Sequence, residues 1–304
     1  MKSGIINIYN EKGFSSFDVV AKLRGILKTK QIGHTGTLDP DAEGVLPVCI
    51  GRATKVCDLL TDKDKVYEAV LLLGVETDTQ DTSGEILKEL PVECDKKQVT
   101  EAISSFVGEY AQIPPMYSAL KVQGKKLYEL AREGKTVERK PRNVKIFSID
   151  ILEISLPRVR MRVHCSKGTY IRTLCHDIGN MLGCGGCMES LLRTRVARFT
   201  LEDACKLSEV DALAKEGRVE ERILTVDKLF EDWTAVWTKP VFDVVVHNGN
   251  PVEKRMLQTE LPTNMERLRV YDSKGAFIGI YEYSGERKNY KPVKMFYEDH
   301  ERNT

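Results

Sequence analysis

The chain has 304 residues, 41% of them hydrophobic and 30% charged, with a formal net charge of +1. This composition is typical of a folded globular protein, and it excludes disordered, collagen-like and fibrous classes. The length predicts one large domain, or a large domain with a small one.

The apolar and polar patterns predict alternating strands and helices through the first three quarters of the chain. In chain order, we predict a strand at 5–9, a helix at 17–27, strands at 45–50 and 67–74, helices at 98–107 and 127–133, strands at 145–156 and 158–165, and helices at 170–182 and 207–216. Ser15 or Ser16 is expected to cap the helix at 17–27, and Gly183 is expected to end the helix at 170–182.

From about residue 233 the sequence pattern changes from alternating helices and strands to short strands. Short strands are predicted at 241–246, 268–271 and 277–283, separated by glycine-containing turns. This pattern predicts a small β-rich unit at the end of the chain. No apolar run approaches the ~18 residues of a membrane helix, and the first residues lack a signal-peptide pattern. We therefore expect a cytoplasmic protein without a membrane span.

Positive charge is concentrated in two segments, although the net charge is close to zero. Residues 118–145 contain nine Lys or Arg and three Glu, and residues 158–198 contain eight Lys or Arg and two acids. Residues 199–233 contain ten acids and five bases. The two basic segments indicate a directional surface for phosphates. A solvated helix face explains the same charge equally well.

The eight cysteines are too few for a disulfide scaffold, and we expect free thiols. The one CxxC pair is Cys184 and Cys187. A closed zinc site needs four ligands, for which Cys175 and His176 are the available partners. Thiols packed beside a glycine turn are the favoured interpretation, so we predict no metal site.

The segment that carries the most chemical information is GHTGTLDPDAEG, at 33–44. Its alternating acids imitate the start of an EF-hand loop from Asp39. Pro40 occupies the second position of that loop, however, and Ile50 stands where a bidentate Glu is required. The glycines do not complete a GxxxxGK[ST] phosphate loop. A carboxylate on a tight loop is left, and such an Asp most often forms or caps a turn.

The longer segment GHTGTLDPDAEGVLPVCIGRATK, at 33–55, resembles the catalytic signature of the TruB-type tRNA pseudouridine synthases. Three more segments similar to this family follow in the same order. They are KVYE (65–68), IPPMYSALKV with LYELAREG (113–122 and 127–134), and SKGTYIRTLCHD (166–177). The resemblance covers about residues 4–230, together with a PUA-like tail.

The resemblance implies an α+β pseudouridine synthase fold with a central mixed, mostly antiparallel sheet and a small C-terminal β-rich PUA-like domain. It implies a catalytic domain at 1–232, with an RNA-gripping insertion at about 118–142, and an RNA-binding domain at 233–304. The implied reaction converts uridine 55 of the tRNA T-loop to pseudouridine after the base has flipped out of its stack. This isomerisation needs no cofactor. The implied partner is the T-stem-loop of tRNA, and we expect a monomer.

The resemblance also assigns catalytic roles to three residues. Asp39 matches the nucleophilic aspartate of the family. Arg172 matches the arginine that pairs with this carboxylate, a task suited to a guanidinium that stays charged. Tyr67 matches the tyrosine that stacks on the uracil, and its hydroxyl can also handle a proton.

Other residues match positions that bind the substrate. His34 matches the histidine associated with the flipped uridine, and Tyr170 and Leu191 match the remaining pocket positions. Leu192 departs from the family, which usually has a basic residue there, and this removes one phosphate contact. The expected RNA contacts of the insertion are Lys125, Lys126 and Arg132.

Two functions of different classes follow from these matches. One is the isomerase, and the other is an RNA-binding or RNA-chaperone protein of the same fold with little catalytic activity. Asp39, Tyr67 and Arg172 are all present, which favours the enzyme. A zinc protein built on Cys184 and Cys187 is the weakest alternative.

Overall fold

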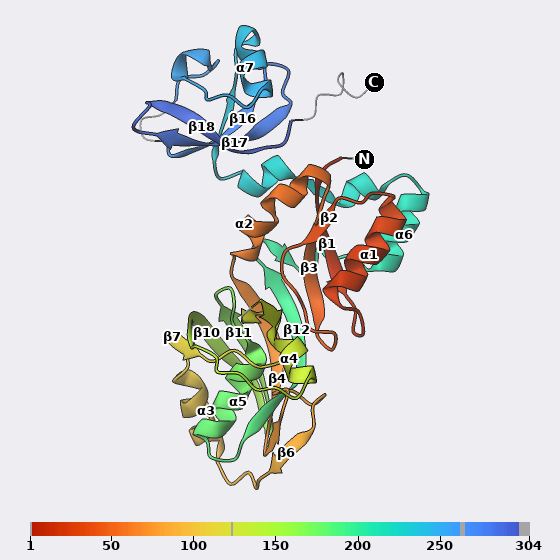
Figure 1. The fold of residues 1–304 in the computed structure, drawn as a ribbon, viewed down its shortest axis with the longest axis vertical. Helices are drawn as coiled ribbons and strands as arrows, with labels where there is room; N and C mark the ends of the chain where they lie inside the picture. The colour runs from red at the N-terminus through yellow and green to blue at the C-terminus, as the bar shows by residue number, and fades with distance from the viewer. Residues whose placement is uncertain (1, 123, 262–264, 298–304) are drawn as a thin grey trace.

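A ten-stranded sheet forms the spine of the larger part of the molecule, and a four-stranded sheet forms a unit at one end (Figure 1). The computed structural model describes residues 2–122, 124–261 and 265–297. The strands of the large sheet are β1 (Gly4–Asn10), β2 (Ile32–His34), β3 (Glu43–Ile50), β4 (Lys65–Leu73), β7 (Gly108–Gln112), β10 (Arg142–Ser155), β11 (Arg158–Cys165), β12 (Gly186–Val196), β13 (Phe199–Thr200) and β14 (Ile223–Thr225).

The strand order of the large sheet is β14-β1-β3-β12-β4-β11-β10-β7, with β2 on β3 and β13 on β12. Among the described strand pairs of this sheet, β12–β3 is parallel and the others are antiparallel. The expected mixed, mostly antiparallel sheet is therefore confirmed. Two hairpins lie outside it, β5 (Val75–Thr77) with β6 (Ile86–Glu89), and β8 (Lys121–Val122) with β9 (Lys125–Lys126).

Alternating burial explains why the central strands form. Along β4, Lys65, Tyr67, Ala69, Leu71 and Leu73 are buried, and the residues between them are partly exposed. The same period of two occurs along β11, as its sequence predicted. One face of these strands therefore packs into a core beneath two helices.

The helices are α1 (Ser16–Leu27), α2 (Cys57–Thr61), α3 (Lys96–Ser104), α4 (Leu127–Arg132), α5 (Ile171–Met181), α6 (Leu207–Lys215) and α7 (Asp243–His247). Ser15 caps α1 in a reciprocal capping box with Asp18. Helices α3 and α5 cover the core face of β4 and β11, whereas α1 and α6 lie beside β1 and β3 (Figure 1). Short 3₁₀ turns cover Gly51–Val56, Val219–Arg222, Val226–Phe230, Pro240–Phe242 and Lys254–Met256.

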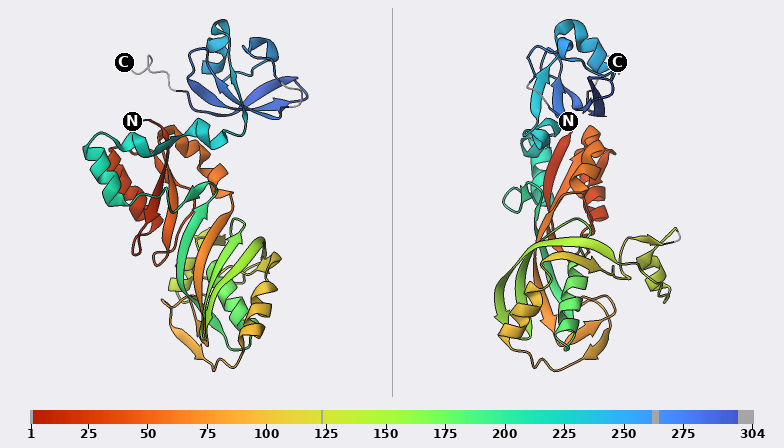
Figure 2. Two further views of the ribbon diagram at one scale, coloured as in Figure 1. Left: turned by 180° about the vertical axis from the view of Figure 1, so that it is seen from behind. Right: turned by 90° about the vertical axis from the view of Figure 1, so that its left-hand side faces the viewer.

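The segment that carries β8, β9 and α4 projects sideways from the body (the right-hand view of Figure 2). It lies within the insertion expected at 118–142. Its root is attached to the body at Tyr117, whose carbonyl accepts from Arg172 at 2.9 Å. Within the segment, the Tyr128 N–H donates to the Ser118 carbonyl at 3.1 Å. The segment therefore starts directly beside a buried arginine of α5.

The C-terminal unit is a four-stranded sheet in the order β15 (Thr234–Trp237), β16 (Arg267–Tyr271), β17 (Phe277–Ser284) and β18 (Asn289–Met295). This confirms a small β-sheet domain at the end of the chain. Lys294 joins it to the body through the Asp58 carboxylate, at 2.5 and 2.6 Å. Ile280 and Phe296 are buried in the same cluster as Val56 and Phe230 of the body. The two parts consequently share a hydrophobic contact as well as an ion pair.

The strand predicted at 241–246 is wrong. Pro240 begins a 3₁₀ turn, and α7 follows it. The valines of this segment suggested a strand because β-branched residues favour extended structure. Asp243 decides otherwise, because its carboxylate accepts hydrogen bonds from Thr238 at 2.5 Å and from Ser273 at 2.6 Å. The sequence pattern predicted no strand at the positions of β12, β15 and β18, nor at those of the shorter strands β2, β5 to β9, β13 and β14. Within the described residues, no helix is long and apolar enough to cross a membrane.

Candidate active site

The loop between β2 and β3 carries Asp39 and is anchored at both sides of that residue. The Leu38 N–H donates to the Ser16 hydroxyl at 2.9 Å, and the Gly13 N–H donates to the Pro40 carbonyl at 2.9 Å. Gly13 lies in the connection between β1 and α1, and Ser16 is the first residue of α1. The turn closes where the Ala42 N–H donates to the Asp39 carbonyl at 2.9 Å. The carboxylate is thus presented from a rigid backbone.

The carboxylate of Asp39 pairs with Arg172, on the first turn of α5. Arg172 Nη2 lies 3.1 Å from Asp39 Oδ2, and the arginine side chain is 6% exposed while that of Asp39 is 44% exposed. The guanidinium also donates to the Thr79 carbonyl at 3.2 Å and to the Tyr117 carbonyl at 2.9 Å. Three chain segments therefore hold one cation beside a carboxylate that a ligand can reach.

A second carboxylate, Asp81, shares this arginine. Asp81 Oδ2 lies 3.5 Å from Arg172 Nη1. Its other oxygen accepts from the Thr79 hydroxyl at 2.7 Å and from the Ser83 N–H at 3.1 Å. Sequence reasoning missed Asp81. The polar run TDTQDTSG at 77–84, between two predicted apolar segments, is the signal that could have drawn attention to it.

These contacts set the acidity of Asp39 in opposite directions. Burial raises the pKa of the Asp39 carboxyl, although part of the side chain is open, and the charge of Asp81 raises it further. The Arg172 guanidinium lowers the same pKa through its charge and its hydrogen bond. Arg172 therefore favours the carboxylate form, which is the form that can act as a nucleophile.

Tyr67 lies on β4, between β11 and β12. It is 9% exposed, and it stands opposite Arg193 of β12 and Val163 of β11. Burial raises the pKa of the Tyr67 hydroxyl, whereas the charge of Arg193 and a hydrogen bond from it lower that pKa. Arg193 is a second functional candidate that sequence reasoning missed, because the motif drew attention to its neighbours Leu191 and Leu192.

His34 ends β2 and packs against an exposed aromatic ring. Its ring and that of Phe17 meet edge to face, with centroids 5.3 Å apart. The Gly36 N–H donates to His34 Nδ1 at 3.3 Å. Burial and the charge of Arg193 lower the pKa of His34, so the neutral ring is favoured. An accepting Nδ1 places the proton of the neutral ring on Nε2.

Tyr170 and Leu191 occupy well-defined backbone positions. The Gln112 side chain holds Tyr170 by accepting from its N–H at 2.8 Å and donating to its carbonyl at 3.0 Å. Leu191 stands opposite Ala69 and packs partly buried against the core. Leu192, which replaces a basic residue of the family pattern, stands opposite Glu68. The Glu68 carboxylate is paired with Arg162 of β11 at 2.7 Å.

Comparison with known proteins identifies the family. A model described as "TruB family pseudouridylate synthase (N terminal domain)" matches residues 24–171, and one described as "tRNA pseudouridylate synthase B C-terminal domain" matches 172–231. A relative from Lachnoclostridium phytofermentans named "tRNA pseudouridine synthase B" is 56% identical over 97% of this chain and 99% of its own. The chain belongs to the TruB family of pseudouridine synthases. Members of this family are isomerases.

Other relatives and solved structures agree with this TruB-family membership. A "tRNA pseudouridine synthase B" from Clostridium acetobutylicum is 44% identical over 96% of this chain and 99% of its own. The structure titled "Crystal Structure of a Cbf5-Nop10-Gar1 Complex" matches with a TM-score of 0.70 and 26% identity, over 97% of this chain and 84% of the other. A chain from the structure of an H/ACA RNP bound to a substrate RNA has the same fold, with a TM-score of 0.71 at 24% identity, over 98% of this chain and 86% of its own. The expected α+β pseudouridine synthase fold is confirmed.

In this TruB-family chain, the projecting segment presents two of its three predicted RNA contacts around one ring. Lys126 Nζ and Arg132 Cζ lie 5.2 and 5.4 Å from the centre of the Tyr128 ring. Lys125 lies 3.5 Å from the Glu133 carboxylate. All these contacts are at the surface, where an ion pair contributes roughly 0–1 kcal/mol. The cations are therefore free to exchange these partners for phosphates.

The cysteines of the CxxC segment in this TruB-family chain are separate buried side chains. Cys175, Cys184 and Cys187 are buried free thiols. Burial raises the pKa of Cys187 to about 11 and that of Cys184 above its ordinary value. Within the described residues, no three His, Cys, Asp or Glu side chains gather closely enough to hold a metal ion.

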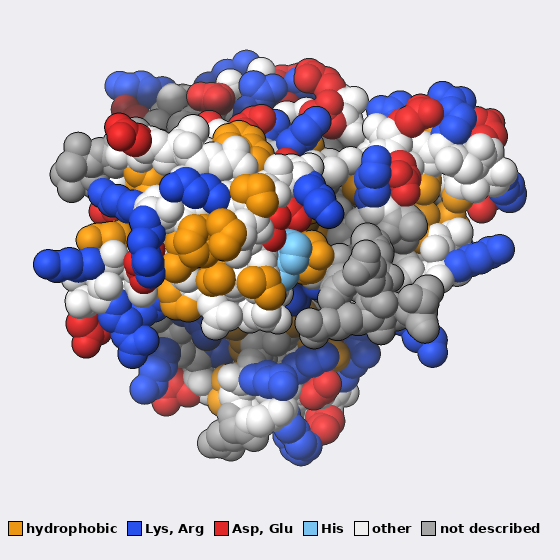
Figure 3. Space-filling model, turned by 90° about the horizontal axis from the view of Figure 1, so that it is seen from above, with side chains coloured by type: hydrophobic (Ala, Val, Ile, Leu, Met, Phe, Trp, Pro, Cys, Tyr) orange, Lys and Arg blue, Asp and Glu red, His pale blue; other side chains and the backbone are white. Residues whose placement is uncertain are grey.

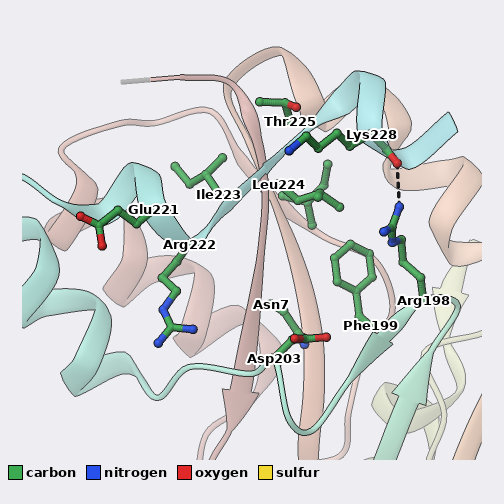
Figure 4. Close-up of a pocket in the computed structure, with 11 residues that line it drawn as sticks. Asn7, Arg198, Phe199, Asp203, Glu221, Arg222, Ile223, Leu224, Thr225 and Lys228 are labelled. Atoms are coloured by element: carbon green, nitrogen blue, oxygen red, sulfur yellow. Dashed lines mark hydrogen bonds between the residues drawn. The ribbon is translucent and has the colours of Figure 1, made fainter. Parts of the chain in front are cut away.

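An open pocket of about 420 Å³ lies beside β1, β13 and β14 (Figure 4). Its lining includes Arg198, Arg222 and Lys228 as well as Asp203 and Glu221, so its charges are mixed. None of the predicted site residues lines it. This pocket is separate from the TruB-family site around Asp39.

Proposed function

We propose that this chain converts uridine 55 in the T-loop of tRNA to pseudouridine, with Asp39 as the nucleophile. The observation that carries the proposal is the pairing of a half-exposed Asp39 with a buried Arg172 at 3.1 Å. The names of the relatives supply the substrate class, since they are tRNA pseudouridine synthases.

Amino-acid side chains alone can carry out this isomerisation. The N1–C1′ bond of uridine breaks and a C5–C1′ bond forms, while C5 loses one proton and N1 gains one. Reactant and product are isomers, so the reaction needs no oxidant, reductant or second substrate. A carboxylate nucleophile and a group that handles a proton are the main requirements. Asp39 supplies the first, and the hydroxyl of Tyr67 supplies the second.

The remaining site residues bind the flipped nucleotide. Tyr67 offers a ring for stacking, which contributes roughly 1–3 kcal/mol per base. Tyr170 and Leu191 line the place of the uracil. His34, with Phe17 beside it, fills the space that the base leaves in the RNA, which offsets part of the few kcal/mol that flipping costs. None of the proposed steps uses a redox cofactor or a metal.

RNA outside the reacting base binds to two further parts of the chain. The insertion at about 118–142 contributes Lys125, Lys126 and Arg132. A PUA-like domain at 233–304 contributes a second surface. Its described residues from 234 to 297 include ten Lys or Arg and seven Asp or Glu. Lys and Arg side chains surround exposed hydrophobic ones at this end of the molecule (Figure 3). We propose that one monomer binds one tRNA.

A T-arm transcript incubated with the purified protein and no additive tests the proposal. Chemical mapping of pseudouridine should then detect one modified position, uridine 55. A transcript with cytidine at this position is the matched control and should stay unmodified. If the protein binds the T-arm and leaves every uridine unchanged, the RNA-chaperone alternative replaces the isomerase.

A further inference from the structure

Arg193 is a buried arginine without a carboxylate beside it. It is 1% exposed, and its hydrogen bonds to the backbone go from Nε to the Val45 carbonyl at 2.7 Å and from Nη2 to the Gly36 carbonyl at 3.3 Å. In the described part of the chain, no Asp or Glu forms an ion pair with it. Burying a charge without a counter-ion is costly, so stability alone does not explain this residue.

The group that faces Arg193 across the sheet is Tyr67. The two residues are direct partners in the register of β12 and β4. The two side chains are also joined by a hydrogen bond, and because a guanidinium has only donors, the Tyr67 oxygen is its acceptor. The other titratable groups acting on Tyr67 are Asp39 and Cys165, and burial raises the pKa of Cys165 to about 12. Cys165 is consequently a neutral thiol at physiological pH.

The surroundings of Tyr67 therefore favour opposite forms of its hydroxyl. Burial and the negative charge of Asp39 raise the pKa of Tyr67, and Arg193 lowers it. Burial, and after it the charge of the same buried cation, lower the pKa of His34 and of Lys65, which falls to about 8. Arg193 thus acts as a fixed positive charge beside Tyr67, and it opposes the burial that leaves the pKa of this hydroxyl raised overall.

We propose that Arg193 is a positioning residue that stabilises the anionic form of the Tyr67 oxygen, so that this oxygen can take the proton from C5 of the uracil. This inference rests on the proposed function. Tyr67 first loses its own proton to water and then takes the proton that leaves C5. N1 takes one proton from water. The net change is one proton lost by C5 and one gained by N1, with Tyr67 protonated again at the end.

A purely structural role predicts different behaviour. Gly36 and Val45 flank the loop of Asp39, so Arg193 also braces that loop. Loss of the brace would reduce the rate equally at every pH, and it would do so whether or not Tyr67 has a hydroxyl. Loss of the Arg193 charge would instead reduce the rate only through Tyr67. This reduction becomes smaller at higher pH, because a larger fraction of the Tyr67 hydroxyl then ionises even without the nearby cation.

Single-turnover release of tritium from a T-arm transcript labelled at C5 separates the two roles. The rates are compared from about pH 6.5 to 9.5 for wild type, Arg193→Met, Arg193→Lys, Tyr67→Phe and the Tyr67→Phe/Arg193→Met double variant. We expect Arg193→Met to lose about 10²-fold or more at neutral pH, the range of proton-transfer catalysis. The difference in rate between this variant and wild type should become smaller as the pH rises. RNA affinity should change by less than about threefold, because the charge acts on the reacting proton.

Two variants keep the experiment decisive. Arg193→Lys retains the charge and should recover at least about tenfold of the lost rate. Arg195→Met is the matched control. A register shift between Arg193 and Arg195 separates their environments, and Arg195 pairs instead with Asp64 at 2.9 Å. Its rate should stay within about twofold of wild type, as expected for a surface pair. If Arg193→Met does not fold, Arg193→Lys is combined with Tyr67→Phe in its place.

Three results would overturn the inference. The first is a loss of rate in Arg193→Met that stays constant with pH. The second is an Arg193→Lys rate no higher than that of Arg193→Met. The third is a further loss of rate, above about threefold, when an Arg193 substitution is added to Tyr67→Phe. Failure of the proposed function is distinguishable, because wild type itself would then release no tritium and form no pseudouridine.

Discussion

Arg172 holds the carboxylate of Asp39 at 3.1 Å while its other nitrogen faces Asp81 at 3.5 Å. The same guanidinium donates to the carbonyl of Tyr117, at the root of the projecting segment. One buried cation thus connects the proposed nucleophile, the polar loop after β5 and the segment proposed to bind RNA. Movement of any of these three can reach the reacting carboxylate through a single side chain.

Asp39→Asn is expected to abolish isomerisation and leave tRNA binding within about threefold, because Asn is nearly isosteric but has no anionic nucleophile. Pseudouridine mapping and equilibrium binding measure the two effects. Near-normal turnover by this variant would contradict the role given to Asp39.

The same substitution has a consequence for stability. Burial raises the pKa of Asp39 in the folded chain, so its contribution to stability is complete below the unfolded pKa and is lost as the pH rises through the folded pKa. Asn removes this dependence. The variant should therefore be at least as stable as wild type at neutral pH, and thermal unfolding at pH 4 and at neutral pH would check the direction.

Asp81→Asn is expected to lower kcat by roughly tenfold or more with little change in KM, since Asp81 acts on the proposed nucleophile and on its partner Arg172. The charge of Asp81 raises the pKa of Asp39, so the acidic limb of the rate profile should move to lower pH. Asp62→Asn, in an exposed pair with Lys167, is the control. An unmoved acidic limb would show that Asp81 does not act through Asp39.

Tyr67→Phe keeps the ring and loses the hydroxyl. We expect its single-turnover rate to fall by roughly 10²–10⁴-fold with nearly unchanged RNA affinity. Tyr67→Leu should lose the rate and also part of the affinity, because it removes stacking worth about 1–3 kcal/mol. A wild-type rate for Tyr67→Phe would leave stacking as the whole role of this residue.

Neutralising Lys125, Lys126 and Arg132 together is expected to weaken tRNA binding and flatten its dependence on salt. Each lost phosphate contact should reduce the slope of log K against log salt by about 0.7–0.9. Replacement of Lys96 and Lys97, which lie on α3, by Gln is the control. An unchanged slope would place the RNA elsewhere on the protein.

Truncation after Asp232 is expected to raise the apparent KM for full tRNA more than it lowers kcat. It should also lower the melting temperature, because Ile280 and Phe296 no longer cover Val56 and Phe230. Rates are therefore compared below that temperature, with a minimal T-arm stem-loop as the second substrate. If turnover of the stem-loop at saturation disappears, the C-terminal unit is part of the reacting site.

The sequence by itself determined the features that depend on neighbours along the chain. The alternation along β11 predicted a half-buried strand, Ser15 marked the start of α1, and the motif around Asp39 indicated the family. Each of these signals is local, since side-chain period and capping are decided within a few residues.

Only the tertiary structure decided which distant residues meet. Asp81 and Arg172 lie far apart in the sequence, and a turn of polar residues gives no sign of the arginine that it will face. Arg193 lies on β12, which was not predicted as a strand, and only the register of β12 against β4 brings its charge to Tyr67. Likewise, the valines of 241–246 favour a strand locally, but the Asp243 carboxylate accepts hydrogen bonds from the nearby Thr238 and from Ser273, thirty residues further along the chain. In each case long-range pairing outweighed local preference. Burial and hydrogen bonding contribute more to the free energy of folding than differences in secondary-structure propensity, which are roughly a few tenths of a kcal/mol per residue.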